Sequence, residues 1–227
     1  MEYSIQGTTM QVVTLQLTAG EQVYTQSGGM CWMSDHFDMA TSMEGGLFGG
    51  LKRALSGDSM FMTTFTCNAP QGMIAFANTF PGHIVPRTLQ AGESVIAQKD
   101  AFLCAERSVT LEMHFRKQLG AGLFGGEGFI LQKLTGPGTV FTELSGEITE
   151  YELQAGQALK VDTGHVAMFE PTVTFDIQML KGFKNVLFGG EGLFLAYLAG
   201  PGKVWLQSMP IQNLAGRIIP FLPKSSS

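Results

Sequence analysis

The sequence predicts an all-β protein made of three tandem β-sandwich units arranged with pseudo-threefold symmetry. The first observation behind this is a phrase that occurs three times, as LTAGE, LQAGE and LQAGQ at residues 17–21, 89–93 and 153–157. The second is another phrase that follows each copy at a nearly constant interval, at residues 57–61, 126–130 and 190–194. Two landmarks that keep step across three copies indicate one folding unit used three times.

Alternating apolar residues are the third observation, and they predict the strands themselves. Val109, Leu111, Met113 and Phe115 alternate with polar residues, and the same pattern returns 64 residues later at 173–179. This period of two is typical of a strand with one face buried and one face in water. Glycine-containing turns separate such segments every ~8–12 residues, which favours a sandwich or barrel. Helix signals are scarce, and the best is the short segment 51–55.

The repeats divide the chain into β units at residues 1–73, 74–139 and 140–227. A unit of this size buries too little surface to be comfortable alone. We therefore expect the three to pack side by side as one compact globule, sharing a core around the pseudo-threefold axis. Their edge strands should be paired or covered, because an exposed edge invites aggregation.

Composition narrows the function classes. Of 227 residues, 44% are hydrophobic and only 15% are charged, with a net charge of −5. An acidic chain with only two adjacent basic pairs, Lys52/Arg53 and Arg116/Lys117, argues against nucleic acid as a partner. A weakly charged surface instead favours a protein partner, a homo-oligomer or a peripheral membrane contact.

The three cysteines, Cys31, Cys67 and Cys104, are far apart and odd in number, so they predict neither a disulfide framework nor a zinc site. Each has apolar neighbours, and we expect three buried free thiols. The first residues have neither a basic region nor an apolar core, so we expect no signal peptide, and no apolar run reaches the ~20 residues of a membrane-spanning helix. We expect a cytoplasmic protein.

Each repeat contains the glycine-rich segment LFGG, which offers candidate interaction loops. The bulky residues of these loops are Leu47 and Phe48, Leu123 and Phe124, and Leu187 and Phe188, with Lys52 and Arg53 beside the first loop. One interpretation is a buried loop whose apolar side chains fill the axis between units, which is the commoner use of apolar residues. The other is an exposed apolar finger that contacts a membrane or a partner.

An acidic residue recurs at one position of the repeat, giving a candidate polar ring of Asp58, Glu127 and Glu191. Such a ring could form a cation site or the mouth of a polar channel. The alternative, which we favour, is that each carboxylate accepts hydrogen bonds from its own glycine loop.

No constellation in the sequence predicts an enzyme. The triplet Asp162-Thr163-Gly164 occurs once, whereas aspartic proteases need two such carboxylates. His165 near Asp162 could be a loop contact, and the four histidines form no metal-binding spacing. The glycine loops lack the strand–loop–helix pattern of phosphate sites. We therefore predict no catalytic residue, no metal and no cofactor.

Four segments resemble a known family: LFGGLKRALSGDSMF, LFGGEGFILQKLTGPGTV, VDTGHVAMFE and LFGGEGLFLAYLAGPGKVWLQ. They are similar to bacterial and archaeal proteins of unassigned function that include the fungal altered inheritance of mitochondria protein 24. The resemblance implies three joined units like the tryptophan RNA-binding attenuation protein, each a small β-sandwich. Within the family that the chain resembles, the mitochondrial member is associated with organisation of the inner membrane. The resemblance carries over no catalytic residue, and a fold analogy does not transfer RNA or tryptophan binding.

The function that these observations favour is a non-enzymatic scaffold or assembly protein, associated with membranes or membrane complexes through the LFGG loops. The alternative is a β-protein that binds a small ligand or a metal, using the acidic ring or the Asp162/His165 pair.

Overall fold

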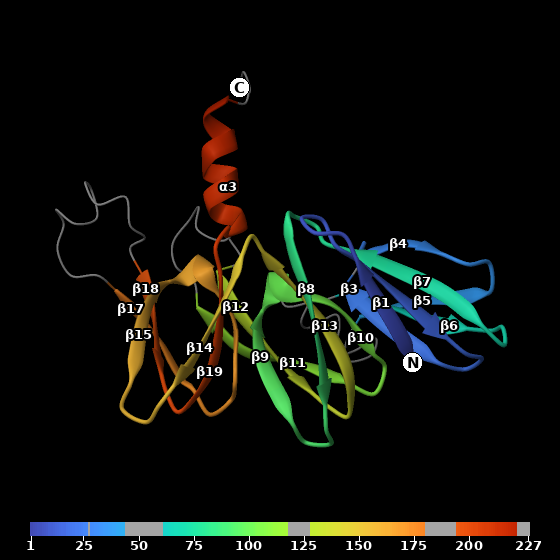
Figure 1. Ribbon diagram of the computed structural model, residues 1–227, viewed down its shortest axis with the longest axis horizontal. Helices are drawn as coiled ribbons and strands as arrows, with labels where there is room; N and C mark the ends of the chain where they lie inside the picture. Colours follow the sequence, from blue (N-terminus) through green and yellow to red (C-terminus); the bar gives the residue numbers. More distant parts are fainter. Residues whose placement is uncertain (27, 44–60, 118–127, 180–193, 222–227) are drawn as a thin grey trace.

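The computed structural model describes residues 1–26, 28–43, 61–117, 128–179 and 194–221 (Figure 1). It confirms an all-β protein, in which antiparallel strands form four sheets. The first sheet has the order β1 (Glu2–Gln6), β2 (Val12–Leu17), β7 (Gly72–Ala77), β4 (Met30–Met33). The fourth has the order β15 (Ala158–Asp162), β18 (Phe194–Ala199), β17 (Thr174–Met179).

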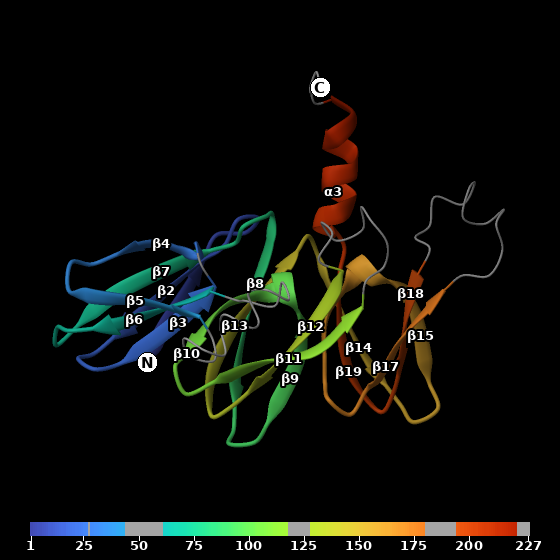
Figure 2. The ribbon, with the colours of Figure 1, turned by 180° about the vertical axis from the view of Figure 1, so that it is seen from behind.

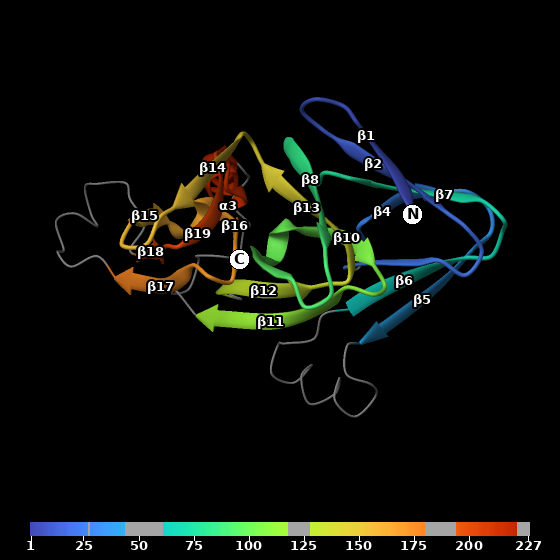
Figure 3. The ribbon, with the colours of Figure 1, turned by 60° about the horizontal axis from the view of Figure 1, so that its bottom comes forward.

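Two six-stranded sheets lie between these in the chain. The second sheet has the order β5 (Phe37–Met43), β6 (Phe61–Cys67), β3 (Gln22–Gln26), β10 (Phe102–Glu106), β13 (Gly138–Ser145), β8 (Gly82–Leu89). The third has the order β11 (Thr110–Lys117), β12 (Phe129–Thr135), β9 (Ser94–Gln98), β16 (Val166–Phe169), β19 (Gly202–Gln207), β14 (Ile148–Leu153). Figure 3 shows β5, β11 and β17 following one another along one side of the molecule.

The helices are short. Turns of 3-10 helix occupy Lys99–Ala101 and Thr163–His165, and helix α3 (Ile211–Ile218) runs into a further 3-10 turn at Ile219–Phe221. Helix α3 projects from the sheets, as the two opposite views agree (Figures 1 and 2). The sequence analysis did not predict α3. The predicted helical segment 51–55 lies outside the described residues.

The turns of the repeated LxAG phrase have one geometry. Each turns the chain from one sheet into the other, and each glycine has a positive φ that only glycine adopts freely: Gly20 at 86°, Gly92 at 82° and Gly156 at 85°. The side chain after each glycine closes the turn by accepting a backbone N–H: Glu21 from Thr18 at 2.7 Å, Glu93 from Gln90 at 2.9 Å, Gln157 from Gln154 at 2.8 Å. The fifth residue of the phrase therefore shapes the corner.

Three clusters of buried side chains form the core. The first core lies between the first two sheets and includes Val13, Phe65 and Phe76, with Cys104 and Phe141 added from β10 and β13. The second core contains other buried residues of β8, β9, β10 and β13, such as Leu89, Val95 and Val140, and is completed by Tyr24 from β3 and by Met168 and Trp205 from β16 and β19. The third core lies between the third and fourth sheets and includes Phe129, Phe169 and Leu198. Strands from successive repeats thus complete each other's cores.

Aromatic packing ties the third core together. The ring of Phe175 on β17 stacks on Phe129 and on Phe169, with centroids 5.7 and 5.4 Å apart, and meets Phe115 edge-on at 5.3 Å. Phe129 and Phe115 come from β12 and β11, so these contacts join the second repeat to the third. Such pairs add ~0.5–1.5 kcal/mol each beyond the area they bury.

The predicted alternation on β11 is wrong at Met113. Leu111 is buried, but Met113, two residues further along the same face of β11, is 40% exposed. The pairing of β11 with β12 then shifts register between Met113 and Phe115, and this bulge turns Phe115 to the other face, where it packs against the third core. Met39 on the edge strand β5 is also exposed.

The strand order recurs along the chain, but two finer predictions stay predictions. These are the unit boundaries at 73/74 and 139/140 and the arrangement of the units about a pseudo-threefold axis. Among the described strands, no pairing joins β4 at one end of the series to β15 at the other.

Replacement of Phe129 by alanine tests whether the third core holds the repeats together. Phe129 is fully buried, so Phe129→Ala should lower the free energy of unfolding by about 3–5 kcal/mol through lost packing and a cavity. Phe221→Ala is the control, because Phe221 is 86% exposed and its loss should change stability by less than about 0.5 kcal/mol. Urea unfolding followed by far-UV circular dichroism measures both, and equal small effects would contradict the packing described.

Candidate functional site

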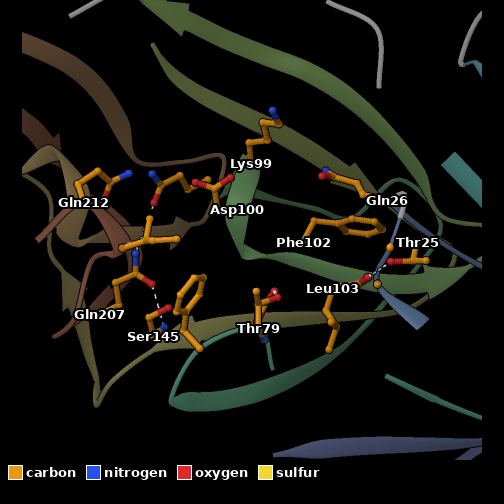
Figure 4. Close-up of a pocket in the computed structure, with 16 residues that line it drawn as sticks. Thr25, Gln26, Thr79, Lys99, Asp100, Phe102, Leu103, Ser145, Gln207 and Gln212 are labelled. Atoms are coloured by element: carbon orange, nitrogen blue, oxygen red, sulfur yellow. Dashed lines mark hydrogen bonds between the residues drawn. The ribbon is translucent and has the colours of Figure 1, made fainter. Parts of the chain in front are cut away.

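A cavity of about 370 Å³ opens where segments of all three repeats meet (Figure 4). Thr25 and Gln26 at the end of β3, with Gly28 and Gly29, line one side, and Gln207 and Gln212 from β19 and α3 line the other. The 3-10 turn at 99–101, with Phe102 and Leu103, and residues of β13 close the space between them. Its lining mixes amide and carboxylate groups with aromatic and aliphatic ones, which is the composition of a small-molecule site.

Gln207 is a buried hydrogen-bonding hub beside this cavity. Its Oε1 accepts the backbone N–H of Ser145 at 3.0 Å, and its Nε2 donates to the Gly164 carbonyl at 2.9 Å. Nε2 also lies 3.4 Å from Oε1 of Gln98. Because these partners lie on three separate segments, one amide fixes the spacing of the cavity wall. No sequence signal marked Gln207.

Glu143 lines the cavity, and its surroundings shift the pKa of its carboxyl group. Burial raises the pKa of Glu143, although Thr79 donates to it from its backbone N–H at 2.6 Å and from its hydroxyl at 2.9 Å. The nearby carboxylate of Asp100 raises the pKa further. Perturbed carboxyl groups of this kind are more frequent at functional sites, although structural networks also produce them.

The Asp162/His165 pair is placed by local structure. Asp162 Oδ1 accepts the N–H of Gly164 at 3.1 Å and so caps the 3-10 turn that follows it. His165 holds the backbone carbonyl of Gln207 through Nδ1 at 2.7 Å, and its Nε2 lies 3.5 Å from the amide of Asn213 on α3. His165 therefore anchors the base of α3, whereas Asp162 stabilises the turn that carries His165.

The other predicted site residues lie outside the described part of the chain. These are the candidate ring of Asp58, Glu127 and Glu191, and the candidate loops with Leu47, Phe48, Lys52, Arg53, Leu123, Phe124, Leu187 and Phe188. Their exposure and their distances from one another stay predictions. Among the described residues, no group of three His, Cys, Asp or Glu side chains could hold a metal ion. In that same part of the chain, no helix has the length and apolar character to cross a membrane.

The prediction of three buried thiols is wrong for Cys31. Cys67 and Cys104 are fully buried free thiols, and burial raises the pKa of Cys104 well above its ordinary value. Cys31 is exposed because it lies on β4, the last strand of the first sheet. The apolar residues next to Cys31 in the sequence could not show that β4 has a paired strand on only one side within the described chain.

Comparison with known proteins gives a consistent result. The family model described as mitochondrial biogenesis AIM24 matches residues 3–209. An uncharacterized protein of Streptococcus pyogenes serotype M6 is 31% identical over 225 residues, covering 95% of this chain and 88% of that protein. The X-ray crystal structure of protein SPYM3_0169 from Streptococcus pyogenes has a TM-score of 0.80 and 27% identity, covering 97% of this chain and 99% of that one. The predicted resemblance is confirmed, and the chain belongs to the AIM24 family.

Proposed function

We propose that this protein is a non-enzymatic, cytoplasmic scaffold or assembly protein that associates with membranes or membrane complexes. In this proposal the three tandem β-sandwich units form a rigid platform, and apolar side chains at its periphery make the contacts. The observation that carries it is the set of exposed apolar residues at the end of α3. Contiguous exposed apolar surface of this kind marks interaction sites more often than chance.

Helix α3 presents one apolar face. Ile211, Leu214 and Ile218 recur at the spacing that places side chains on one side of a helix, while Asn213 and Arg217 lie on the other. Ile218 is 48% exposed, and Ile219 and Phe221 beyond it are 62% and 86% exposed. The base of the helix is anchored through Asn213 and His165, so its far end extends from the body (Figure 2). An amphipathic helix with an arginine on its polar face suits a membrane interface.

The exposed ends of two strands supply a second line of support. Phe61 at the start of β6 is 49% exposed, and Met179 at the end of β17 is 65% exposed. In the sequence, Phe61 directly follows a segment that contains LFGG, and Met179 directly precedes another. The proposal therefore assigns membrane or partner contact to the LFGG segments as well as to α3.

Vesicle co-sedimentation tests the membrane form of this proposal. The wild-type protein should pellet with phosphatidylcholine vesicles that contain phosphatidylglycerol, and Ile219→Ser/Phe221→Ser should reduce vesicle binding by about tenfold or more, because apolar burial at the interface is lost. Leu47→Ser/Phe48→Ser should also weaken binding. Tyr151→Ser is the matched control, since Tyr151 is a 44% exposed aromatic residue on β14 and belongs neither to α3 nor to an LFGG segment. Negligible pelleting of wild type, or equal pelleting of all four proteins, would refute the membrane contact.

The cavity favours a second candidate function, a β-protein that binds a small ligand. Its volume suits a small metabolite, and its polar groups converge from three segments of the chain. Elemental analysis of the purified protein, with a thermal-shift screen of divalent metals and common metabolites, distinguishes the two candidates. A ligand that binds only the folded protein at 100 times its Kd raises stability by about 2.7 kcal/mol. No bound metal and no shift would count against this candidate.

Glu143→Gln tests the electrostatics of the cavity. The folded protein favours the protonated form of Glu143, so this carboxyl contributes stability below its ordinary pKa of 4.5 and loses that contribution as pH rises through the raised folded-state pKa. Wild type should therefore lose stability relative to Glu143→Gln as pH increases from about 4.5. The glutamine keeps an oxygen that can accept from the Thr79 N–H. Urea unfolding of both proteins across this pH range gives the answer, and a difference that does not change with pH would contradict burial as the cause.

A further inference from the structure

The two outer sheets have the strand orders of the two halves of an inner sheet. Each six-stranded sheet joins a half such as β5-β6-β3 to a half such as β10-β13-β8. The fourth sheet, β17-β18-β15, repeats the first kind of half, and β4-β7-β2 of the first sheet repeats the second kind. Within the described chain, β15 and β4 each lack the partner that their counterparts have. In Figure 1 they lie at opposite ends of the molecule.

The two inner junctions share one antiparallel register. Thr25 on β3 lies opposite Cys104 on β10, and Ala97 on β9 lies opposite Met168 on β16. Alignment on the repeated LxAG phrase places Val161 of β15 at the position of Thr25 and Ala97. The same alignment places Trp32 of β4 at the position of Cys104. A junction between β4 and β15 in this same register would therefore set Trp32 opposite Val161.

Strand β4 also has the backbone shape of the strands that do pair. The register of β10 against β13 shifts between Phe102 and Cys104, and that of β16 against β19 shifts between Val166 and Met168. Strand β4 shifts against β7 between Met30 and Trp32, at the same position. A bulge re-aims the following side chains, so Trp32 is directed as Cys104 and Met168 are.

Burial shows what the missing junction would cover. Cys104 and Met168 are fully buried because each faces the core of the preceding repeat, whereas Trp32 is 50% exposed. Val23 and Val95 are fully buried in the inner sheets, but Leu159, at their position on β15, is only partly buried, as is Val161. The third core is thus open on the side where a following repeat would close it.

From these observations we infer that β4 of one copy pairs antiparallel with β15 of a second copy, and that Trp32 enters the third core of that copy. This inference rests on the proposed assembly function and names its partner, a second copy of this chain. The contact joins unlike surfaces, so repeated use builds a ring if the rotation closes and an open chain if it does not.

Lys160 makes the proposed junction weaker than the inner ones. It occupies the position of Tyr24 and Ile96, which are 5% and 3% exposed and face the core of the following repeat. At the new junction Lys160 would lie opposite Met33, with its aliphatic stem along the strand and its ammonium group directed to solvent. A lysine on an edge strand also limits indiscriminate pairing. The assembly should therefore be reversible.

Sedimentation velocity over a range of protein concentrations tests the inference. Wild type should show an average mass above the monomer that increases with concentration. Trp32→Asp should weaken association by ~30-fold or more, as expected when an anchoring aromatic residue is lost. Lys160→Ile, which introduces the residue found at this position on β9, should strengthen it. Tyr151→Asp, a matched loss of a half-exposed aromatic residue on β14, should behave as wild type. A monomeric wild type at all concentrations, or assembly retained by Trp32→Asp, would overturn the inference.

Disulfide trapping tests the register directly, in a Cys31→Ser background. Opposed residues of antiparallel strands lie ~4.5–5.5 Å apart at Cα, within the reach of a disulfide. Trp32→Cys/Val161→Cys should give chains linked to one another on oxidation, whereas Trp32→Cys/Thr149→Cys should not. A disulfide formed only within single chains, or no disulfide, would overturn the pairing. Loss of vesicle binding in the earlier test would leave both of these readouts unchanged, so the two proposals fail separately.

Discussion

Antiparallel pairing between strands of successive repeats is the interaction on which the rest of this structure depends. β3 pairs with β10, and β9 pairs with β16, so each six-stranded sheet is built from two repeats. The pairing aligns side chains that then complete a neighbour's core, as Cys104 and Phe141 do for the first core. A single repeat would leave these apolar surfaces in water. Its small size would not supply enough other burial to compensate.

This arrangement explains why the cavity lies where it does. The segments that follow β3 and β9 leave the sheet beside a junction, and α3 and β19 meet them from the last repeat. The position of the cavity is thus a consequence of how repeats join, and Gln207 maintains it by bonding to groups from three segments. Any ligand held there would contact several repeats at once. It would stabilise their relative placement by mass action.

The sequence predicted the local features of the fold better than the long-range ones. The corner glycines Gly20, Gly92 and Gly156 could be identified because a positive φ is a local demand that few other residues meet. Pairing between repeats uses main-chain groups, which leave no side-chain motif. One signal was present: Val95, Ile96 and Ala97 form an uninterrupted apolar run, as expected for a strand covered on both faces. Its partner, however, could not be read from that run.

The errors in prediction also have physical causes. A period of two assumes unbroken pleating, and the bulge after Met113 on β11 turns Phe115 to the face opposite Leu111. Cys31 resembles a core residue by composition, and its exposure depends on which strand lies at the end of a sheet. Helix α3 is only eight residues long and includes Gly216, so its apolar spacing was too short to stand out from the surrounding loops. The candidate cavity required the three-dimensional meeting of segments more than a hundred residues apart, from Thr25 to Gln207.

The ends of the repeat series differ in how well they are closed. At the N-terminal end, β1 adds to β2 and covers one edge of the first sheet, while β4 remains the last strand at its other edge. At the C-terminal end, Leu159 and Val161 remain partly buried on β15, where inner strands have fully buried residues. Strand β1 therefore covers the edge that has no counterpart junction between inner sheets. The edges at β4 and β15 do have such counterparts, and within the described residues no strand pairs with either edge. Strand β4 repeats the order and the bulge of the inner strands β10 and β16, and β15 repeats the order of β3 and β9 with a lysine at one buried position; a reversible contact between copies explains these two edges better than chance exposure does.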